Sequence, residues 1–176
     1  MLERLIHRFR DSTRTAPPGA ATHQAGVIPY ALENGVPVFL LVTTRRTGRW
    51  IFPKGACEAD ETLHACAARE AFEEAGVEGE IAGSAVGAYR DRKHAARASV
   101  IEVEMYPLHV TRQHDEWPES KTRKRHWVTL AEARELITTP GLFDLAERAD
   151  AQIRAAAKAP AADGSAARQQ IKSKIQ

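Results

Sequence analysis

Three glutamates, Glu70, Glu73 and Glu74, have a spacing that could hold a metal ion. In an α-helix, at about 100° per residue, their side chains fall within an arc of about 100°. Glu70 and Glu74 are like charges four residues apart, a pairing that costs a few tenths of a kcal/mol. A hard divalent cation such as Mg²⁺ would relieve this repulsion, because it binds carboxylate oxygens. Glutamates are also common on a solvated helix face, so these three residues alone leave both interpretations open.

The residues around the glutamates predict a helix with defined ends. Thr62 can accept a hydrogen bond from a first-turn amide, and Gly76 is a typical C-terminal stop. We expect Arg69 to reach Glu73 one turn away and to point away from the other two glutamates. The side of the helix opposite the glutamates carries small residues and one aromatic ring, which we expect to pack against a neighbouring layer: Ala65, Ala68, Phe72 and Ala75.

Short β-rich runs lie before and after this helix. Residues 26–32 and 36–43 are joined by Asn34-Gly35, and Asn-Gly between apolar runs is the strongest short hairpin signal. Pro29 lacks an amide hydrogen and indicates that the first run is an edge strand or contains a bulge. Mixed strands and helices without an internal repeat predict one α/β (α+β) layered domain over residues 23–150. We expect further strands at residues 50–52, 82–89, 99–106 and 126–128, a polar loop at 111–121, and helices at 130–137 and from 141 onwards.

Composition narrows the class of protein. A length of 176 residues suits one domain with a core, and a net charge of +2 argues against wholesale nucleic-acid binding. Cys57 and Cys66 are the only cysteines, which argues against a disulfide scaffold or a Cys-rich zinc site. We recognise no membrane span and no signal peptide, and therefore expect a cytoplasmic protein. Residues 1–22 are expected to form an extension and linker, and residues 151–176 a tail that is helical to about Lys158 and then disordered.

The pattern around the glutamates is more specific than the glutamates alone. It comprises Gly55, Glu61, Arg69, Glu70, Glu73, Glu74 and Gly76, with apolar Val77 following. This spacing resembles the signature box of the Nudix hydrolases, enzymes that cleave a diphosphate linked to another group, and every charged and glycine position of the box is filled. The one small departure is Ala71, where the family usually has a larger aliphatic residue.

This resemblance implies a Nudix-type α/β/α sandwich with a mixed sheet, and a cofactor that is Mg²⁺ or Mn²⁺. It implies that Glu70, Glu73, Glu74 and the Gly55 carbonyl hold the metal, and that Arg69 and Glu61 brace and orient these ligands. One glutamate of the box is expected to act as general base, and the sequence does not decide which. Candidates for an additional ligand, each also typical of a solvated surface, are Glu102, Glu104 and Asp115.

Basic segments outside the box extend the resemblance. Residues 49–55, 92–94 and 123–127 resemble the diphosphoinositol polyphosphate phosphohydrolase subgroup, whose members also cleave diadenosine polyphosphates. The likeness covers roughly residues 24–138, and its departures at Lys54 and His126 leave the exact substrate open. Cations at three separated places suit a substrate with crowded phosphates, but they also suit solvated loops or nucleic-acid contacts. The candidate substrate-binding residues are Arg45, Arg46, Arg49, Lys54, Arg92, Lys93, His94, Lys124 and Arg125.

The leading hypothesis is therefore a Mg²⁺-dependent pyrophosphohydrolase that acts on a highly phosphorylated small molecule, of the diadenosine polyphosphate or inositol pyrophosphate type. A nucleoside triphosphate or nucleotide-sugar pyrophosphatase is the alternative among enzymes. A non-catalytic nucleotide- or RNA-binding module is the alternative of another class, although such a module would be expected to lose ligand glutamates. His109 and His114 lack metal-ligand spacing and are expected to be surface or capping residues. The sequence leaves the oligomeric state open.

Overall fold

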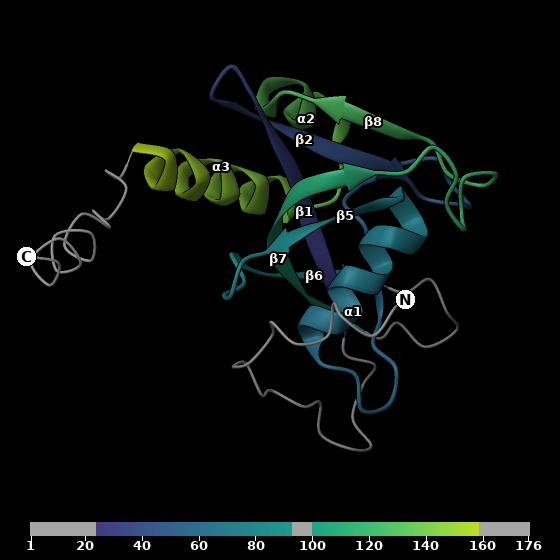
Figure 1. The fold of residues 1–176 in the computed structure, drawn as a ribbon. Coiled ribbons are helices and arrows are strands. Elements are labelled where there is room, and N and C mark those ends of the chain that lie inside the picture. Colours follow the sequence, from purple (N-terminus) through teal and green to yellow (C-terminus); the bar gives the residue numbers. More distant parts are fainter. Residues whose placement is uncertain (1–23, 93–99, 159–176) are drawn as a thin grey trace, which may run out of the picture.

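The computed structural model describes residues 24–92 and 100–158, which form a mixed sheet flanked by helices (Figure 1). The expected N-terminal extension, Lys93, His94 and the tail beyond Lys158 lie outside the described residues. The strands are β1 (Gln24–Glu33), β2 (Val36–Thr43), β3 (Trp50–Ile51), β4 (Lys54–Ala56), β5 (Val77–Ile81), β6 (Gly87–Arg92), β7 (Val100–Gln113) and β8 (Arg125–Val128). The helices are α1 (Leu63–Glu70), followed by a π-helical turn, η2 (Ala71–Ala75), then α2 (Leu130–Leu136) and α3 (Leu142–Lys158).

The sheet is mixed, as the resemblance implied. Within the described residues its eight strands run in the order β3-β2-β1-β7-β5, with β4 paired to β1, β6 to β7 and β8 to β2. Only the central pair β1 and β7 is parallel among these pairings. The predicted hairpin is confirmed: Asn34 and Gly35 form its turn with φ of 51° and 79°, values that favour this residue pair.

Helices cover both faces of the sheet. Every residue of β2 from Pro37 to Thr43 is buried, which is typical of a strand enclosed on two sides. Helix α1 packs against β1, whereas α2 and α3 contact β2; Figure 1 shows α1 in front of the strands and α2 beside β2 and β8. The largest fully buried side chains include Phe39, Phe52 and Met105. The layered α+β architecture therefore agrees with the prediction.

Pro29 lies in the central strand β1, so the prediction of an edge strand or bulge is wrong. On one side β1 pairs with β7 through Pro29 and Leu108. On its other side β1 changes partner, from β4 at Gly26 to β2 at Tyr30. The amide of Val27 donates to Pro53 on that second side. The backbone nitrogen of Pro29, two residues later, points to this same side. It lies between the residues that pair with β4 and those that pair with β2, so its missing amide hydrogen interrupts no hydrogen-bonded strand pair.

Several strand limits differ from those predicted. The expected strand 82–89 starts only at Gly87, and the unpredicted β5 directly follows the site helix. β7 continues to Gln113, into the segment expected to be a loop, because its second half pairs with β5. The hydrogen-bonding register shifts between Glu78 and Gly79. Because of this irregularity and of Gly79 within the strand, the residues of β5 do not show the regular alternation of apolar and polar side chains that predicts a strand.

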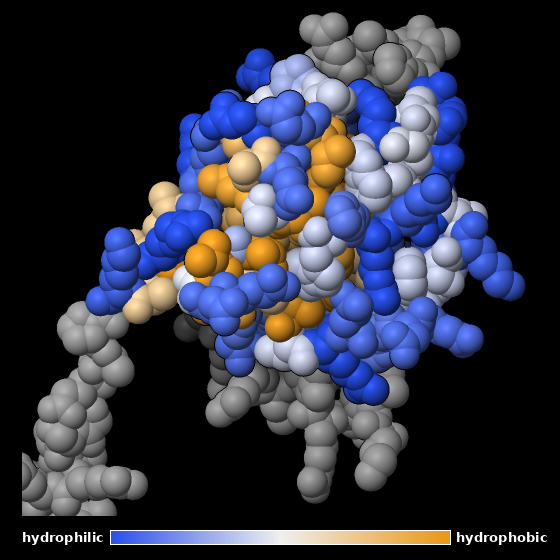
Figure 2. Space-filling view, turned by 90° about the horizontal axis from the view of Figure 1, so that it is seen from above, coloured by the Kyte–Doolittle hydropathy of each residue, from blue (hydrophilic) through white to orange (hydrophobic). Residues whose placement is uncertain are grey.

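The surface of the described residues includes a few large apolar side chains. Figure 2, seen from above, shows an apolar area bordered by hydrophilic residues. Leu32 and Val36, each 44% exposed, flank the turn of the β1–β2 hairpin. Within residues 24–92 and 100–158, no helix combines the length and the apolar character needed to cross a membrane.

Candidate metal and catalytic site

The helix that carries the glutamates has the predicted ends. The hydroxyl of Thr62 accepts a hydrogen bond from the amide of Ala65 at 3.2 Å. Gly76 ends the π-helical turn in the left-handed region, with φ of 65°, and its amide donates to the carbonyls of Ala71 and Phe72. A Cβ at this position would also lie 2.7 Å from the Trp117 side chain. Single π-helical turns of this kind often occur at functional sites.

The glutamate face of this helix is its buried face, which corrects the predicted orientation. Glu70 and Glu74 are only 7% and 6% exposed, whereas Phe72 is 37% exposed and its ring packs nearly perpendicular to that of His114. Of the four residues expected to pack inward, only Ala75 is buried. The buried positions recur every three or four residues, as one helix face requires. They are Leu63, Cys66, Ala67, Glu70, Ala71, Glu74 and Ala75.

Arg69 connects the buried carboxylates to the preceding loop. Its guanidinium donates to Glu70 at 2.7 Å and to Glu73 at 3.2 Å. The contact with Glu73 was predicted, but the expectation that Arg69 points away from Glu70 is wrong. The same guanidinium donates twice to Glu61, at 3.1 and 3.0 Å, and to the carbonyl of Ala56 at 2.9 Å. The guanidinium of arginine, with five donors in a fixed plane, can join the loop and the helix in this way, whereas the ammonium group of a lysine has only three donors.

Glu74 is held from the opposite side by Arg123, a residue that sequence reasoning did not include in the site. Arg123 donates to both Glu74 and Glu119, and to the carbonyl of Thr43 at 2.8 Å. The amide of Lys54 also donates to Glu74, at 3.1 Å. The sequence signals that included Arg123 were the basic run 121–125 and the resemblance at residues 123–127, and the structure buries Arg123. Burial of one of these cations depends on the fold, so the run itself does not identify it.

The backbone at Gly55 lies against Glu70. A Cβ added at Gly55 would fall 2.0 Å from a carboxylate oxygen of Glu70, so a side chain would displace this carboxylate. The chain thus gathers two buried carboxylates beside a strand backbone, with Glu73 half-buried next to them. Oxygen donors with little space between them suit a hard divalent cation. The residues present therefore fit Mg²⁺ or Mn²⁺.

Burial dominates the electrostatics of the carboxylates. It raises the pKa of Glu70, and it raises the pKa of Glu74 to about 7 even though Arg123 acts in the opposite direction. Burial would also raise the pKa of Glu61, but hydrogen bonds from Arg69 and from the Glu58 amide outweigh it and lower that pKa. The two buried carboxylates therefore lack full compensation by the protein, and a divalent cation beside them would favour their ionised forms.

Two of the predicted substrate cations lie along one cavity. Arg45 and Lys124 line a cavity of about 560 Å³ together with Lys121, which sequence reasoning did not include. Arg45 is exposed and pairs with Glu119 at 3.1 Å. Lys54 does not line this cavity, and its ammonium group pairs with Asp91 at 2.9 Å.

Arg125 has a packing role in the structure. Its guanidinium lies 4.0 Å from the centre of the Trp117 ring and donates to the carbonyl of Ala75 at 2.9 Å. It thereby secures the end of the site helix. Arg46 and Arg49 are exposed, and Arg49 donates to Thr47 at 3.3 Å.

The remaining candidates do not join the carboxylate cluster through any described contact. Glu104 accepts a hydrogen bond from the Tyr106 hydroxyl at 2.8 Å, and Glu102 and Asp115 are exposed. His109 stacks on Tyr30 with ring centres 5.2 Å apart. His114 contacts Glu78 at 2.5 Å. Arg92 ends β6, and the placement of its side chain is not described.

Comparisons with known proteins agree with this architecture. Nudix hydrolase 21 (chloroplastic) of Arabidopsis thaliana is 37% identical over 116 residues, which cover 63% of this chain and 57% of the relative. Diphosphoinositol polyphosphate phosphohydrolase 3-beta of Homo sapiens is 33% identical over 128 residues, which cover 70% of this chain and 73% of the relative. The crystal structure of a C. elegans Ap4A hydrolase binary complex is similar with a TM-score of 0.61 and 19% identity, covering 77% of this chain and 99% of that chain.

The plant match spans little more than half of that relative's length, and the likeness to the solved structure concerns the fold alone. The stronger finding is the match of a family model, that of the NUDIX domain, to residues 22–149. This range contains the whole carboxylate cluster together with Arg69 and Arg123. The chain therefore belongs to the Nudix family.

Proposed function

We propose that this protein hydrolyses phosphoanhydride bonds with Mg²⁺ or Mn²⁺ as cofactor. The observation that carries the proposal is the pair of buried carboxylates, Glu70 and Glu74, beside the backbone of Gly55. Burial of two carboxylates costs free energy unless cations compensate them. Arg69 and Arg123 compensate these carboxylates only in part, because burial still raises the pKa of both. Membership of a family with named hydrolases supports the catalytic use.

Each residue of the cluster then has a proposed role. Glu70, Glu73, Glu74 and the Gly55 carbonyl would hold the metal, which when bound neutralises phosphoryl oxygens and lowers the pKa of coordinated water. Arg69 would keep the glutamates in place and would itself be kept in place by Glu61. A glutamate of the cluster would accept the proton of the attacking water.

The proposed substrate is a small molecule with several adjacent phosphates, such as an inositol pyrophosphate or a diadenosine polyphosphate. The cavity lined by Arg45, Lys121 and Lys124 supports this class, because clustered cations suit clustered phosphates. The name of the human relative, a diphosphoinositol polyphosphate phosphohydrolase, supports it as well. A cytoplasmic location stays a prediction, since the plant relative is named as a chloroplastic protein.

The reaction is tested by incubating the purified protein with Mg²⁺ and a panel of diphosphate compounds. The panel contains inositol pyrophosphates, diadenosine polyphosphates, nucleoside triphosphates and nucleotide sugars. Glu74→Gln should lose most of the turnover, whereas Glu135→Gln, on the exposed side of α2, should keep it. Without metal-dependent turnover on any member, the enzyme hypothesis fails in favour of a binding module. Equal turnover by Glu74→Gln would remove this residue from the site.

The substrate class is tested separately with Lys124→Ala. Loss of one charge-assisted phosphate contact should raise KM for the longest polyphosphates by about tenfold, equivalent to about 1.4 kcal/mol. Arg112→Ala, a change of an exposed arginine on β7, is the matched control and should leave KM unchanged. If KM rises equally for a nucleotide sugar, the cavity does not select for the number of phosphates.

A further inference from the structure

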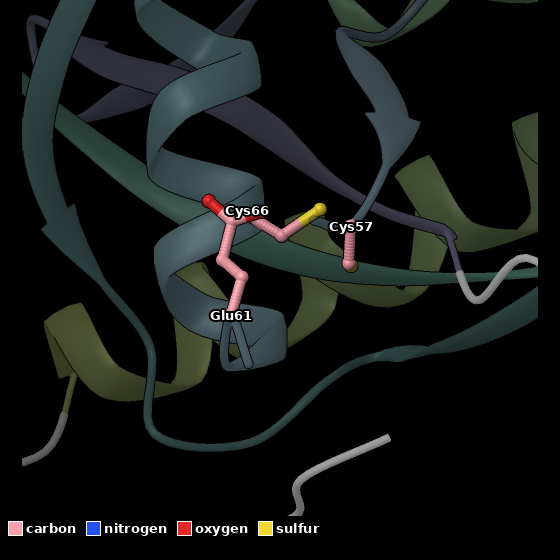
Figure 3. Close-up of side chains that lie close together, drawn as sticks. All are labelled: Cys57, Glu61 and Cys66. Carbon is pink, nitrogen blue, oxygen red and sulfur yellow. The ribbon is translucent and has the colours of Figure 1, made fainter. Parts of the chain in front are cut away.

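A second cluster of metal-ligating side chains lies beside the carboxylate site. Cys57, Glu61 and Cys66 each offer one ligand atom, and these atoms all lie within 4.8 Å of one another. Figure 3 shows the sulfur of Cys66 turned toward Cys57, while the Glu61 side chain extends from the loop along α1. The three residues come from the segment after β4, the following loop and α1. The proposed phosphoanhydride reaction makes no use of the two thiols.

The Cys66 side of the cluster is buried, whereas the side with Cys57 and Glu61 is partly exposed. Cys66 is fully buried, and its thiol donates to the carbonyl of Gly55 at 3.7 Å. Cys57 and Glu61 are only half-buried, so the cluster is accessible from their side. Arg69 donates to the sulfur of Cys66 at 3.8 Å and to Glu61. A cation is thus already placed to stabilise negative charge on these ligands.

The donor set selects a different metal from the one expected at the glutamates. Sulfur is a ligand for Zn²⁺ and other soft or borderline ions, whereas Mg²⁺ takes oxygen. With Zn–S bonds of about 2.3 Å, two sulfurs on one tetrahedral zinc lie roughly 3.8 Å apart. The separations of at most 4.8 Å therefore need only a small contraction. A water molecule would complete the four positions.

Zinc would compensate most of the negative charge at this site. Each thiol releases its proton to solvent on binding, so two thiolates and the Glu61 carboxylate together carry three negative charges. One Zn²⁺ supplies two positive charges, and the Arg69 guanidinium, which is shared with Glu70 and Glu73, offsets part of the third. Such compensation suits a site with one fully buried ligand.

We propose that Cys57, Glu61 and Cys66 form a site for Zn²⁺ or a similar thiophilic divalent ion, distinct from the glutamate site. The bound ion would link the loop before α1 to the helix itself. It would also fix Glu61, the residue that orients Arg69 toward the glutamates. A metal ion at the cysteines would thus restrict the movement of Glu61 and Arg69, which hold Glu70 in place, without taking part in the reaction.

The test uses Co²⁺ as a spectroscopic probe on the protein of residues 1–176, reduced and freed of metal. Co²⁺ bound to thiolate gives a near-ultraviolet charge-transfer band, which Zn²⁺ should then abolish at one equivalent. Cys57→Ala and Cys66→Ala should lose the band and bind Zn²⁺ at least about a hundredfold more weakly, more than a lost outer-shell partner costs. Zn²⁺ should also raise the Tm of the native chain by roughly 5 to 10 °C at saturating excess.

Two matched variants separate this site from the glutamate site. Glu58→Gln changes an exposed acidic side chain of the same loop and should keep the band. Glu74→Gln should also keep it, although the proposed hydrolysis is lost. No band in the native protein would overturn the proposal, as would a band of equal strength in Cys57→Ala. Circular dichroism of Cys57→Ala, whose side chain is half-buried, confirms that loss of the band is not loss of fold.

Discussion

Replacement of Arg123 by methionine tests whether a buried cation keeps Glu74 in place. Methionine retains much of the apolar volume of the side chain but removes its five donors. The side chains of Arg123 and Glu74 are 6% and 8% exposed, so water cannot replace the lost partner easily. The variant also leaves the carbonyl of Thr43 without the donor that lies at 2.8 Å in the native protein.

The cost depends on the protonation of Glu74. Removal of one partner of a buried ion pair costs about 3 to 5 kcal/mol when the remaining group stays charged. Glu74 can avoid part of this cost by binding a proton, because burial already raises its pKa to about 7. We therefore expect the variant to be destabilised by about 2 kcal/mol at pH 6 and by about 3 kcal/mol at pH 8.

The sign follows from linkage. A carboxyl group whose pKa is raised by folding lowers the stability of the metal-free protein progressively as pH rises above its unfolded pKa. In the native chain this loss levels off near the folded pKa of Glu74, about 7. Without Arg123 that pKa is higher, so the loss continues to higher pH. The difference between the two proteins can therefore grow by up to about 1.4 kcal/mol per pH unit above pH 7.

Urea unfolding in the presence of a chelator, at pH 6 and pH 8, measures both differences. Arg112→Met is the control, because Arg112 is an exposed arginine of β7 and should change stability by less than about 0.5 kcal/mol. Equal destabilisation of Arg123→Met at the two pH values would refute the coupling to Glu74. A deficit below about 1 kcal/mol at both would show that the buried contacts contribute little.

Two further predictions concern the same cluster. Gly55→Ala should lower kcat by about a hundredfold, because the added Cβ would fall 2.0 Å from Glu70 and displace its carboxylate. The control is Gly83→Ala, where the added Cβ meets open space and kcat should equal that of the native chain. Equal kcat values for the two variants would contradict this prediction. The dissociation constant of Mg²⁺, measured by calorimetry, should rise by up to about tenfold per pH unit below about pH 7 as protons compete for Glu74, and stay level above it. A constant that does not change between pH 6 and pH 8 would exclude this competition.

Local signals in the sequence predicted local structure well. Asn34-Gly35 fixed the hairpin because its backbone angles suit few other pairs. Thr62 and Gly76 marked the helix ends because capping depends on neighbouring backbone groups only. Spacing also grouped Glu70 with Glu74 on one side of the helix.

Orientation of that helix could not be obtained in the same way. A helical projection shows which residues share a side, but not which side meets the core. Glu70 and Glu74 can be buried because partners distant in sequence compensate them, and Arg123 is 49 residues from Glu74. The basic run 121–125 likewise contains one buried cation, Arg123, and one that stacks on Trp117, Arg125, and only the tertiary structure separates them.

The contacts of Glu74 combine support with free coordinating capacity. One of its oxygens accepts from Arg123 and the other from the amide of Lys54. An ionised carboxylate has about four acceptor positions, so each oxygen retains one for a metal ion. Arg69 similarly contacts one oxygen of Glu70. These donors hold the carboxylates in place before any metal arrives, so metal binding need not order them. The repulsion between the like charges therefore lowers the stability of the fold and does not weaken metal binding.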